Sequence, residues 1–277
     1  MNVEDAVRLG IAELPAREGI PDPRREAAWL LAAAWGVEEI TLRVHPEREV
    51  PADVAGRYRS WLARRAAGEP AHHLTGVCRF WGRDFEVSPA VLVPRPETEF
   101  VIEVALSLPL TPTARVLDVG TGSGCLAVTL AAERPQWRVS AVDRSLAALA
   151  VARRNVKRNG VELRTWVGDL SSAVEPPWDL VVANLPYIPT KDLGSLSVEV
   201  LRDPPSALDG GADGLDLIRR LIADLGRLLR PCGGAILEVG DDQADAVSRL
   251  AGAEGLAVAR RLRDPGGAER VIVLQPR

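Results

Sequence analysis

A short polar sequence at the end of an apolar run carries the clearest chemistry of this chain. Residues 180–183 read Leu-Val-Val-Ala, which is typical of a buried parallel strand, and Asn184, Leu185, Pro186 and Tyr187 follow. Because Pro186 cannot donate to a strand ladder, the strand must end before it, at the sheet edge where open α/β folds bind ligands. The Asn184 side-chain oxygen and the Leu185 carbonyl are neighbouring acceptors that suit a planar NH2 group, with Tyr187 packed on its flat face. An ordinary strand end with a turn asparagine explains the motif equally well.

A glycine-rich loop follows an earlier predicted strand. It consists of Gly120, Thr121, Gly122, Ser123 and Gly124. Glycines let a ligand approach the backbone closely, and the N-terminus of the helix predicted behind the loop favours negative charge. A dinucleotide fingerprint would need its third glycine at position 125, where Cys125 stands. The loop therefore favours a nucleotide-like ligand over the nicotinamide cofactor of a dehydrogenase.

Three aspartates mark the ends of three successive predicted strands. Asp118 lies just before the loop, Asp143 ends the second strand, and Asp169 follows the third. An acidic residue at the position of Asp143 takes ribose hydroxyls in nucleotide-binding α/β folds, and Asp169 is placed to accept from an adenine amino group. Each alone is more often a strand-end cap, but together with the loop they favour a site.

An alternation of strands and helices must position these residues. Strands are predicted at 115–119, 137–142, 163–167, 180–183, 235–239, 256–262 and 270–274, and helices at 97–108, 125–133, 146–158, 214–229 and 242–253. This rhythm predicts an α/β fold with a doubly wound, mostly parallel seven-stranded sheet. A turn is expected at 231–234, and the Pro- and Gly-rich stretch 188–213 has loop composition, which indicates a functional loop or disorder.

The first 70 residues have a different pattern. Three helices are expected, one of them starting at Asp22-Pro23 and ending at Gly36, and the third starting near Pro51. Aromatic residues around Gly82 then predict a hairpin. We therefore expect a small helical domain over residues 1–70, a hairpin linker over 71–94 and the α/β domain over 95–277. Arg95, between two prolines, is either a rigid linker residue or part of a site wall.

Composition limits the function classes. The chain of 277 residues has a net charge of −4, which gives no basic footprint for nucleic acid, so direct nucleic-acid binding is not expected. Three cysteines far apart and three histidines predict reduced thiols and no metal site. No run reaches the roughly 18 apolar residues of a membrane span, and no signal peptide is recognised. We expect a cytoplasmic protein that has no membrane partner.

The loop, the strand-end acids and the Asn184 motif together resemble class I S-adenosylmethionine (SAM) methyltransferases. The motif is similar to the Asn/Asp-Pro-Pro-Tyr sequence of enzymes that methylate planar amino groups. Further matches are Gly68-Glu69-Pro70, Leu74-Thr75-Gly76, residues 93–99, residues 202–208, residues 213–216 and residues 263–267. From near residue 20 to the end, the chain resembles the release factor glutamine N5-methyltransferase family (PrmC/HemK).

The resemblance implies a reaction and its participants. SAM would be the cofactor and S-adenosylhomocysteine its product, without a metal. The substrate would be the glutamine of the Gly-Gly-Gln motif in class I peptide chain release factors, recognised by the helical domain and the 188–213 loop. The resemblance assigns SAM binding to residues 120–124 and Asp143, and amide binding to residues 184–187, with Asn184 also beside the cofactor.

Two residues depart from the family pattern. Leu185 stands where the family has proline, but only its carbonyl is needed as an acceptor. Leu170 stands where an aromatic residue often follows Asp169, so stacking on adenine would become apolar packing. The sequence Asn-Leu-Pro-Tyr also resembles the motif of rRNA adenine methyltransferases. A nucleic-acid base amino group, a small amide or metabolite, and a non-catalytic SAM-binding module therefore stay open as alternatives.

Overall fold

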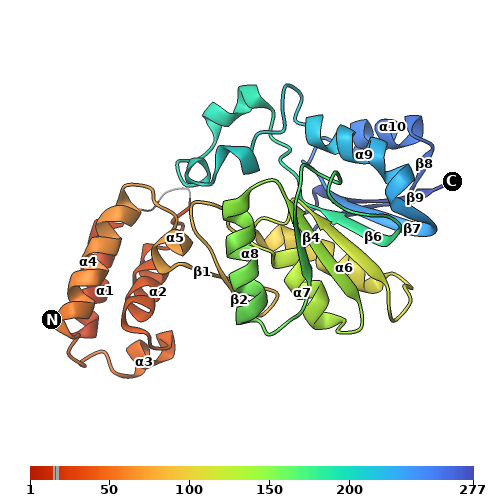
Figure 1. Cartoon of the computed structure of the whole chain (residues 1–277). Coiled ribbons are helices and arrows are strands. Elements are labelled where there is room, and N and C mark those ends of the chain that lie inside the picture. Colours follow the sequence, from red (N-terminus) through yellow and green to blue (C-terminus); the bar gives the residue numbers. More distant parts are fainter. Residues whose placement is uncertain (15, 17–18) are drawn as a thin grey trace. The chain divides into compact units, whose positions relative to one another are not determined.

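The computed structural model describes residues 1–14, 16 and 19–277 (Figure 1). The chain divides into two compact units. The first contains Met1–Val77 and Leu196–Arg202, and the second contains Cys78–Ser195 and Asp203–Arg277. A short piece of the long 188–213 stretch therefore belongs to the N-terminal unit, although the residues on both sides of it belong to the other.

The N-terminal unit is helical. Its helices are α1 (Val3–Glu13), α2 (Pro23–Trp35), α3 (Glu39–Val44), α4 (Ala52–Ala66) and α5 (Ala71–Thr75). Asp22 caps α2 by accepting from the N–H groups of Arg24 and Arg25, and Gly36 ends it in the left-handed conformation, as predicted. The three predicted helices correspond to α1, α2 and α4. Helices α3 and α5 were missed, because they are only six and five residues long and too short to show a helical period.

A buried arginine holds the 196–202 segment to these helices. The Arg65 side chain is 1% exposed, and it forms ion pairs with Glu26 over 2.6 Å and with Glu199 over 2.7 Å. The same guanidinium donates to the carbonyls of Gly19 and Glu69. The segment includes the short helix η3 (Val200–Arg202). Burial of a charge is tolerated here because each guanidinium nitrogen has a partner.

The second unit contains a seven-stranded sheet. Its strands are β3 (Arg115–Val119), β4 (Arg138–Asp143), β5 (Arg164–Val167), β6 (Trp178–Ala183), β7 (Leu229–Glu238), β8 (Leu256–Arg263) and β9 (Glu269–Pro276). They lie in the order β5-β4-β3-β6-β7-β9-β8. Pairs from β5 to β7 are parallel, and β9 is antiparallel to β7 and β8. The predicted mostly parallel, seven-stranded α/β sheet is confirmed.

Helices cover both faces of the sheet. They are α6 (Glu99–Ser107), α7 (Cys125–Glu133), α8 (Leu146–Arg158), α9 (Asp216–Leu228) and α10 (Ala244–Ala253). Val116, Leu180 and Val182 pack with α6 and α7, whereas their neighbours Leu117 and Val181 pack with α9 and α10. This alternation follows from the two-residue period of a strand, and it explains why the strand sequences are apolar throughout.

Smaller elements complete this unit. They are the hairpin of β1 (Val77–Phe80) and β2 (Arg83–Glu86), and the short 3₁₀ helices η1 (Pro96–Thr98), η2 (Thr190–Ser195) and η4 (Pro205–Ala207). The hairpin is confirmed, and its turn residues Trp81 and Gly82 both have positive φ. The helix expected from residue 97 instead starts with η1, and α6 follows. Short 3₁₀ turns also interrupt the stretch that was expected to be loop.

The turn expected at 231–234 was wrong. Strand β7 already begins at Leu229, and its register on β6 jumps from Trp178 paired with Leu229 to Leu180 paired with Gly234. The intervening residues form an irregularity within the strand. Pro231 is tolerated there because a proline that cannot donate fits a bulge.

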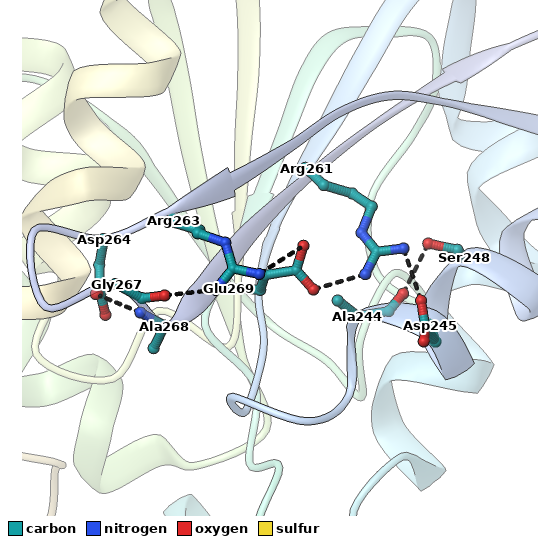
Figure 2. A network of polar contacts seen from close by, with 9 residues as sticks. All are labelled: Ala244, Asp245, Ser248, Arg261, Arg263, Asp264, Gly267, Ala268 and Glu269. Carbon is teal, nitrogen blue, oxygen red and sulfur yellow. Dashed lines mark hydrogen bonds and ion pairs between the residues drawn. The ribbon is translucent and has the colours of Figure 1, made fainter.

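The turn between β8 and β9 is held by its own polar contacts (Figure 2). The backbone N–H and Oδ1 of Asp264 bond to the backbone of Ala268, and Arg263 donates to the Gly267 carbonyl over 2.7 Å. Farther along, Arg261 bridges Asp245 of α10 and Glu269 of β9. The turn thereby fixes the start of β9, where Arg270 lies.

Candidate active site

A pocket opens at the carboxyl edge of the sheet, within the second unit. Its lining includes the residues after β3, β4, β5 and β6, and its outer wall includes Ala90, Val91, Leu92, Pro94, Arg95, Pro204, Ser206 and Ala207. All of the predicted site residues line it except Gly124 and Tyr187. The structure thus brings the glycine loop, two of the strand-end acids and the Asn184 motif to one cavity, which Asp118 also lines.

The glycine loop adopts a backbone that requires glycine. Gly120, Gly122 and Gly124 have φ values of +75°, +54° and +82°. A Cβ on Gly120 would come within 2.8 Å of the Leu185 side chain, whereas one on Gly122 would meet nothing closer than 4.0 Å. The loop is therefore packed against the Asn184 motif on one side and open at Gly122. Gly124 lies behind the pocket wall as the N-cap of α7.

Asp143 ties this loop to the end of β4. Its Oδ2 accepts from the Gly122 N–H over 2.9 Å, and its Oδ1 accepts from the Ser145 N–H over 2.8 Å. A carboxylate oxygen has two lone pairs, so each oxygen keeps one acceptor site. Because Asp143 lines the pocket and is partly exposed, a hydroxyl group of a ligand could use these sites.

Asp118 supports the same loop from below. Its Oδ2 accepts from the Thr121 hydroxyl over 2.6 Å and from the Ala127 N–H over 3.2 Å, while Oδ1 has no hydrogen-bond partner among the described residues. Burial raises the pKa of this carboxyl to about 7, against the opposing effect of its two donors. Asp118 therefore joins the strand, the loop and the first turn of α7.

Asp169 and Leu170 form another part of the wall. The Asp169 carboxylate is about half exposed and pairs with Arg220 over 2.6 Å. Leu170 is buried and has a φ of +50°, an uncommon conformation for a leucine. Its side chain packs in the core that contains β3, β6 and α9. Leu170 thus offers apolar surface at the place where an aromatic residue was considered.

The Asn184 side chain is fixed by a contact from a distant part of the chain. Its Nδ2 donates to Thr98 Oγ1 over 3.0 Å, and both residues line the pocket. The next residue, Leu185, is 3% exposed and packs in the main core. Since the amide nitrogen is engaged by Thr98, the amide oxygen Oδ1 is the group that faces away from this bond.

Tyr187 is not among the residues that line the pocket. It packs partly buried against the same core, and its carbonyl accepts from Gln243 Nε2 over 2.8 Å. Burial raises the pKa of its hydroxyl, and the neighbouring Glu238 carboxylate adds to this effect. The predicted place of Tyr187 on the flat face of a substrate group stays a prediction.

Arg95 forms part of the wall. It lines the pocket and pairs with the buried Asp203, whose other oxygen accepts from the Val93 N–H. Burial raises the pKa of Asp203 to about 6, against the lowering effect of Arg95. Of the two interpretations of Arg95, the structure favours the site wall.

Among residues 1–14, 16 and 19–277, no group of three or more His, Cys, Asp or Glu side chains is arranged to hold a metal ion. Within the same ranges, no helix is both long enough and apolar enough to cross a membrane.

Comparisons with known proteins identify the family. Residues 5–76 match the family model of the PrmC N-terminal domain, and residues 98–212 match that of the methyltransferase small domain. The chain is 44% identical to the release factor glutamine methyltransferase of Pseudomonas aeruginosa, over 92% of this chain and 93% of that protein. It is 42% identical to that of Cereibacter sphaeroides, over 98% of both. The chain belongs to the release factor glutamine methyltransferase family.

Solved structures support the fold of this family member. A methyltransferase from Pyrococcus furiosus superposes with a TM-score of 0.54 at 20% identity, over 70% of this chain and 89% of that chain. The predicted family and the class I methyltransferase fold are therefore confirmed.

Several residues in or beside the pocket of this methyltransferase were missed from its sequence. Thr98 lies in a 3₁₀ turn, and Pro204, Ser206 and Ala207 belong to the stretch that was expected to be loop. Glu238, which interacts with the Thr98 and Asn184 side chains, ends strand β7. The sequence did contain a signal for Glu238. Like Asn184, it is a polar residue that directly follows an apolar strand run, here Ala235 to Leu237.

Proposed function

We propose that this protein transfers a methyl group from SAM to the side-chain amide nitrogen (N5) of the glutamine in the Gly-Gly-Gln motif of class I peptide chain release factors. Membership of the family supports this reaction, because the similarity to its members covers almost the whole chain. The observation that carries the proposal to this chain is the Asn184 amide, which is held by Thr98 at the wall of the pocket that also contains the glycine loop.

The pocket residues fit SAM. The loop is open at Gly122, because a Cβ placed there would have its nearest neighbour, the Gly120 carbonyl oxygen, 4.0 Å away. A ligand can therefore approach the backbone closely. Asp143 keeps two acceptor sites for ribose hydroxyls, and Asp169 and Leu170 offer a polar group and apolar surface for the adenine. Residues 120–124, Asp143, Asp169, Leu170 and Asn184 would hold the cofactor, and the product S-adenosylhomocysteine would leave the same groups.

The chain's own contribution to the reaction is positional. SAM supplies a methyl group on a sulfonium, which is a good leaving group, so we expect no need for a metal. A glutamine amide nitrogen is a poor nucleophile, because its lone pair is delocalised into the carbonyl. The Asn184 Oδ1 and the Leu185 carbonyl accept the two amide hydrogens, hold the nitrogen and favour its pyramidal form. Orienting two reactants can supply on the order of 7–11 kcal/mol of a barrier.

The helical unit is proposed to recognise the release factor. We assign recognition to residues 1–70, the hairpin linker to 71–94 and methyl transfer to 95–277. The 196–202 segment supports a role of the 188–213 loop in this recognition. It is part of the same compact unit as the helices, and Arg65 forms an ion pair with its Glu199. On α3, Ile40 and Val44 are about 60% exposed, and they supply apolar surface for a protein partner.

The test uses purified protein, radiolabelled SAM and a class I release factor. A parallel reaction contains the same factor with its Gly-Gly-Gln glutamine changed to alanine. We expect label only in the unchanged factor and, by mass spectrometry, at that glutamine. Asn184→Ala should lower kcat at least 100-fold and lower the affinity for S-adenosylhomocysteine far less, because the substrate amide loses its acceptor while the other cofactor-binding groups remain. Label in neither factor, with cofactor binding intact, would overturn the substrate, and RNA and small amides would then be tested with the same label.

A further inference from the structure

Two buried polar side chains, Thr98 and Glu238, interact with the Asn184 side chain. We propose that Glu238 and Thr98 are positioning residues that fix which way the Asn184 amide faces, so that its oxygen, and not its NH2 group, is presented to the substrate. The inference rests on the proposed function, because it concerns the acceptor that holds the glutamine amide. It goes beyond that function in assigning roles to two residues that do not belong to the Asn184 motif.

The three side chains come from three elements. Asn184 follows β6, Glu238 ends the neighbouring strand β7, and Thr98 lies in η1. Asn184 Nδ2 donates to Thr98 Oγ1 over 3.0 Å, and the Glu238 carboxyl interacts with both the Thr98 and the Asn184 side chains. Glu238 is 2% exposed and Thr98 is equally buried. Strands β6 and β7 are in parallel register, with Ala183 opposite Leu237, which places Asn184 opposite Glu238.

The direction of the hydrogen bonds follows from their chemistry. A hydroxyl group can donate or accept, so Thr98 alone would tolerate either orientation of the Asn184 amide. An ionised carboxylate can only accept. With Glu238 ionised, Thr98 donates its single proton to the carboxylate, and its oxygen must then accept. Only the NH2 group of Asn184 can satisfy that oxygen, and Oδ1 is turned the other way.

Glu238 acts through its neighbours and not on the substrate. Thr98 and Asn184 are among the residues that line the pocket, and Glu238 is not. Its Oε2 has no hydrogen-bond partner among the described residues. A buried carboxyl with an open acceptor is costly. The presence of Glu238 beside the proposed substrate acceptor is explained if the site needs a group there that can only accept hydrogen bonds.

Charged neighbours tune this carboxyl. Arg270 of β9 favours its ionised form and Glu97 of η1 disfavours it, while Tyr187 and Cys125 are the other titratable groups that interact with it. Burial is the largest effect and raises the pKa of Glu238 to about 7. Below that pH a protonated Glu238 can itself donate to Thr98. The oxygen of Thr98 is then satisfied from the other side, and the amide loses its fixed orientation.

Nuclear magnetic resonance of the Asn184 side-chain NH2 group tests this positioning role without measuring catalysis. In the unmodified full-length protein, its proton and nitrogen shifts should titrate with a midpoint near pH 7. The titration should disappear in Glu238→Gln. It should shrink but remain in Thr98→Val, where Glu238 keeps its direct interaction with Asn184, and it should persist in Asp118→Asn, which removes another buried carboxyl of raised pKa. Asn184 shifts that are the same in Glu238→Gln and in the unmodified protein at every pH would overturn the proposal.

Methylation kinetics test the consequence. Glu238→Gln and Thr98→Val should each lower kcat at least tenfold with S-adenosylhomocysteine affinity within twofold, and Thr98→Ser should recover at least fivefold over Thr98→Val. The double variant should lose no more than the worse single variant, because both act on one amide. Exposed Glu254→Gln, after α10, is the matched control. Independent, multiplying losses would contradict a shared role.

The two proposals fail differently. If the unmodified protein transfers no label to a release factor, the proposed function fails. The Asn184 titration then still decides whether Glu238 and Thr98 orient the Asn184 amide. If the unmodified protein is active and Glu238→Gln matches it in kcat at every pH, the positioning role fails while the function stands.

Discussion

The Oδ2 of Asp143 accepts a hydrogen bond from the backbone N–H of Gly122 over 2.9 Å, and so joins the end of β4 to the middle of the glycine loop. The aspartate thus has two tasks, because the same carboxylate holds the loop and offers its remaining acceptor sites to the pocket. Gly122 has no side chain to fix it, so this bond adds to the hydrogen bonds that hold its neighbours Gly120 and Thr121 to the Val142 carbonyl.

Replacing Asp143 tests both tasks. Asp143→Ala removes two charge-assisted hydrogen bonds to backbone amides, each of which contributes about 1.5–3 kcal/mol. We expect the affinity for S-adenosylhomocysteine, measured by calorimetry, to fall at least 30-fold. Asp143→Asn keeps one oxygen acceptor and should lose less. The control is Asp241→Ala, an exposed aspartate after β7. Equal affinities of the Asp143→Ala and control variants would contradict the assignment.

Asp118 makes stability depend on pH. The folded protein raises its pKa from the ordinary 3.8 to about 7, so folding favours the protonated form. The stabilisation from this group is complete below pH 4 and is lost as the pH rises through 7, with a slope of up to about 1.4 kcal/mol per pH unit. Glu238, raised from 4.5 to about 7, acts in the same direction.

Urea unfolding of the unmodified protein and of Asp118→Asn at pH 5 and pH 8 measures this contribution. The free energy of unfolding should fall more between these pH values in the unmodified protein than in the variant. An identical fall in the two proteins would show that Asp118 titrates at its ordinary pKa.

The parts of the site that were predicted follow from one physical rule. Ligands of open α/β sheets lie at the carboxyl ends of strands, and Asp143, Asp169 and Asn184 are polar residues that end apolar runs. Their strands, β4, β5 and β6, run parallel in one sheet with β3 between β4 and β6, so their carboxyl ends meet at the same edge and bring the three residues to one pocket. The helix boundaries at Cys125–Glu133 and Leu146–Arg158 were also predicted, because glycine and Asn159-Gly160 flank them.

Other features depend on contacts that no local pattern records. Thr98 reaches Asn184 across 86 positions of sequence. The segment 196–202 joins the helical unit because Glu199 meets the buried Arg65. The irregularity in β7 exists because β6 continues beside it, and the proline suggested a turn when β7 was considered alone.

Leu185 replaces the proline of the family motif, and its side chain has a packing role. It is buried in the main core and lies against the loop at Gly120. Leu185→Pro should lower the free energy of unfolding by about 1–3 kcal/mol, because part of the buried side chain is lost. Since the proposed acceptor is the backbone carbonyl, kcat should stay within threefold. Steady-state methylation and urea unfolding give the two numbers. A kcat as low as that of Asn184→Ala would show that the leucine side chain itself is needed.

The neighbours Arg64 and Arg65 give a matched pair of changes in the helical unit. Arg65 is 1% exposed and pairs with Glu26 and Glu199, which are about one-fifth exposed, whereas Arg64 is half exposed and pairs with Glu69. Breaking a buried ion pair costs about 3–5 kcal/mol, and an exposed one at most about 1 kcal/mol. Since water reaches both glutamates in part, we expect Arg65→Met to cost about 2–4 kcal/mol.

Hydrogen exchange followed by mass spectrometry measures this effect segment by segment, because the changed residue lies in one of two compact units. In Arg65→Met, peptides that cover α4 and residues 196–202 should exchange at least tenfold faster, while those from β3 to β6 keep their rates. Arg64→Met should match the unmodified protein throughout. Unchanged exchange at 196–202 in Arg65→Met would mean that the segment is held by its backbone and apolar contacts, and that the buried ion pair does not anchor it.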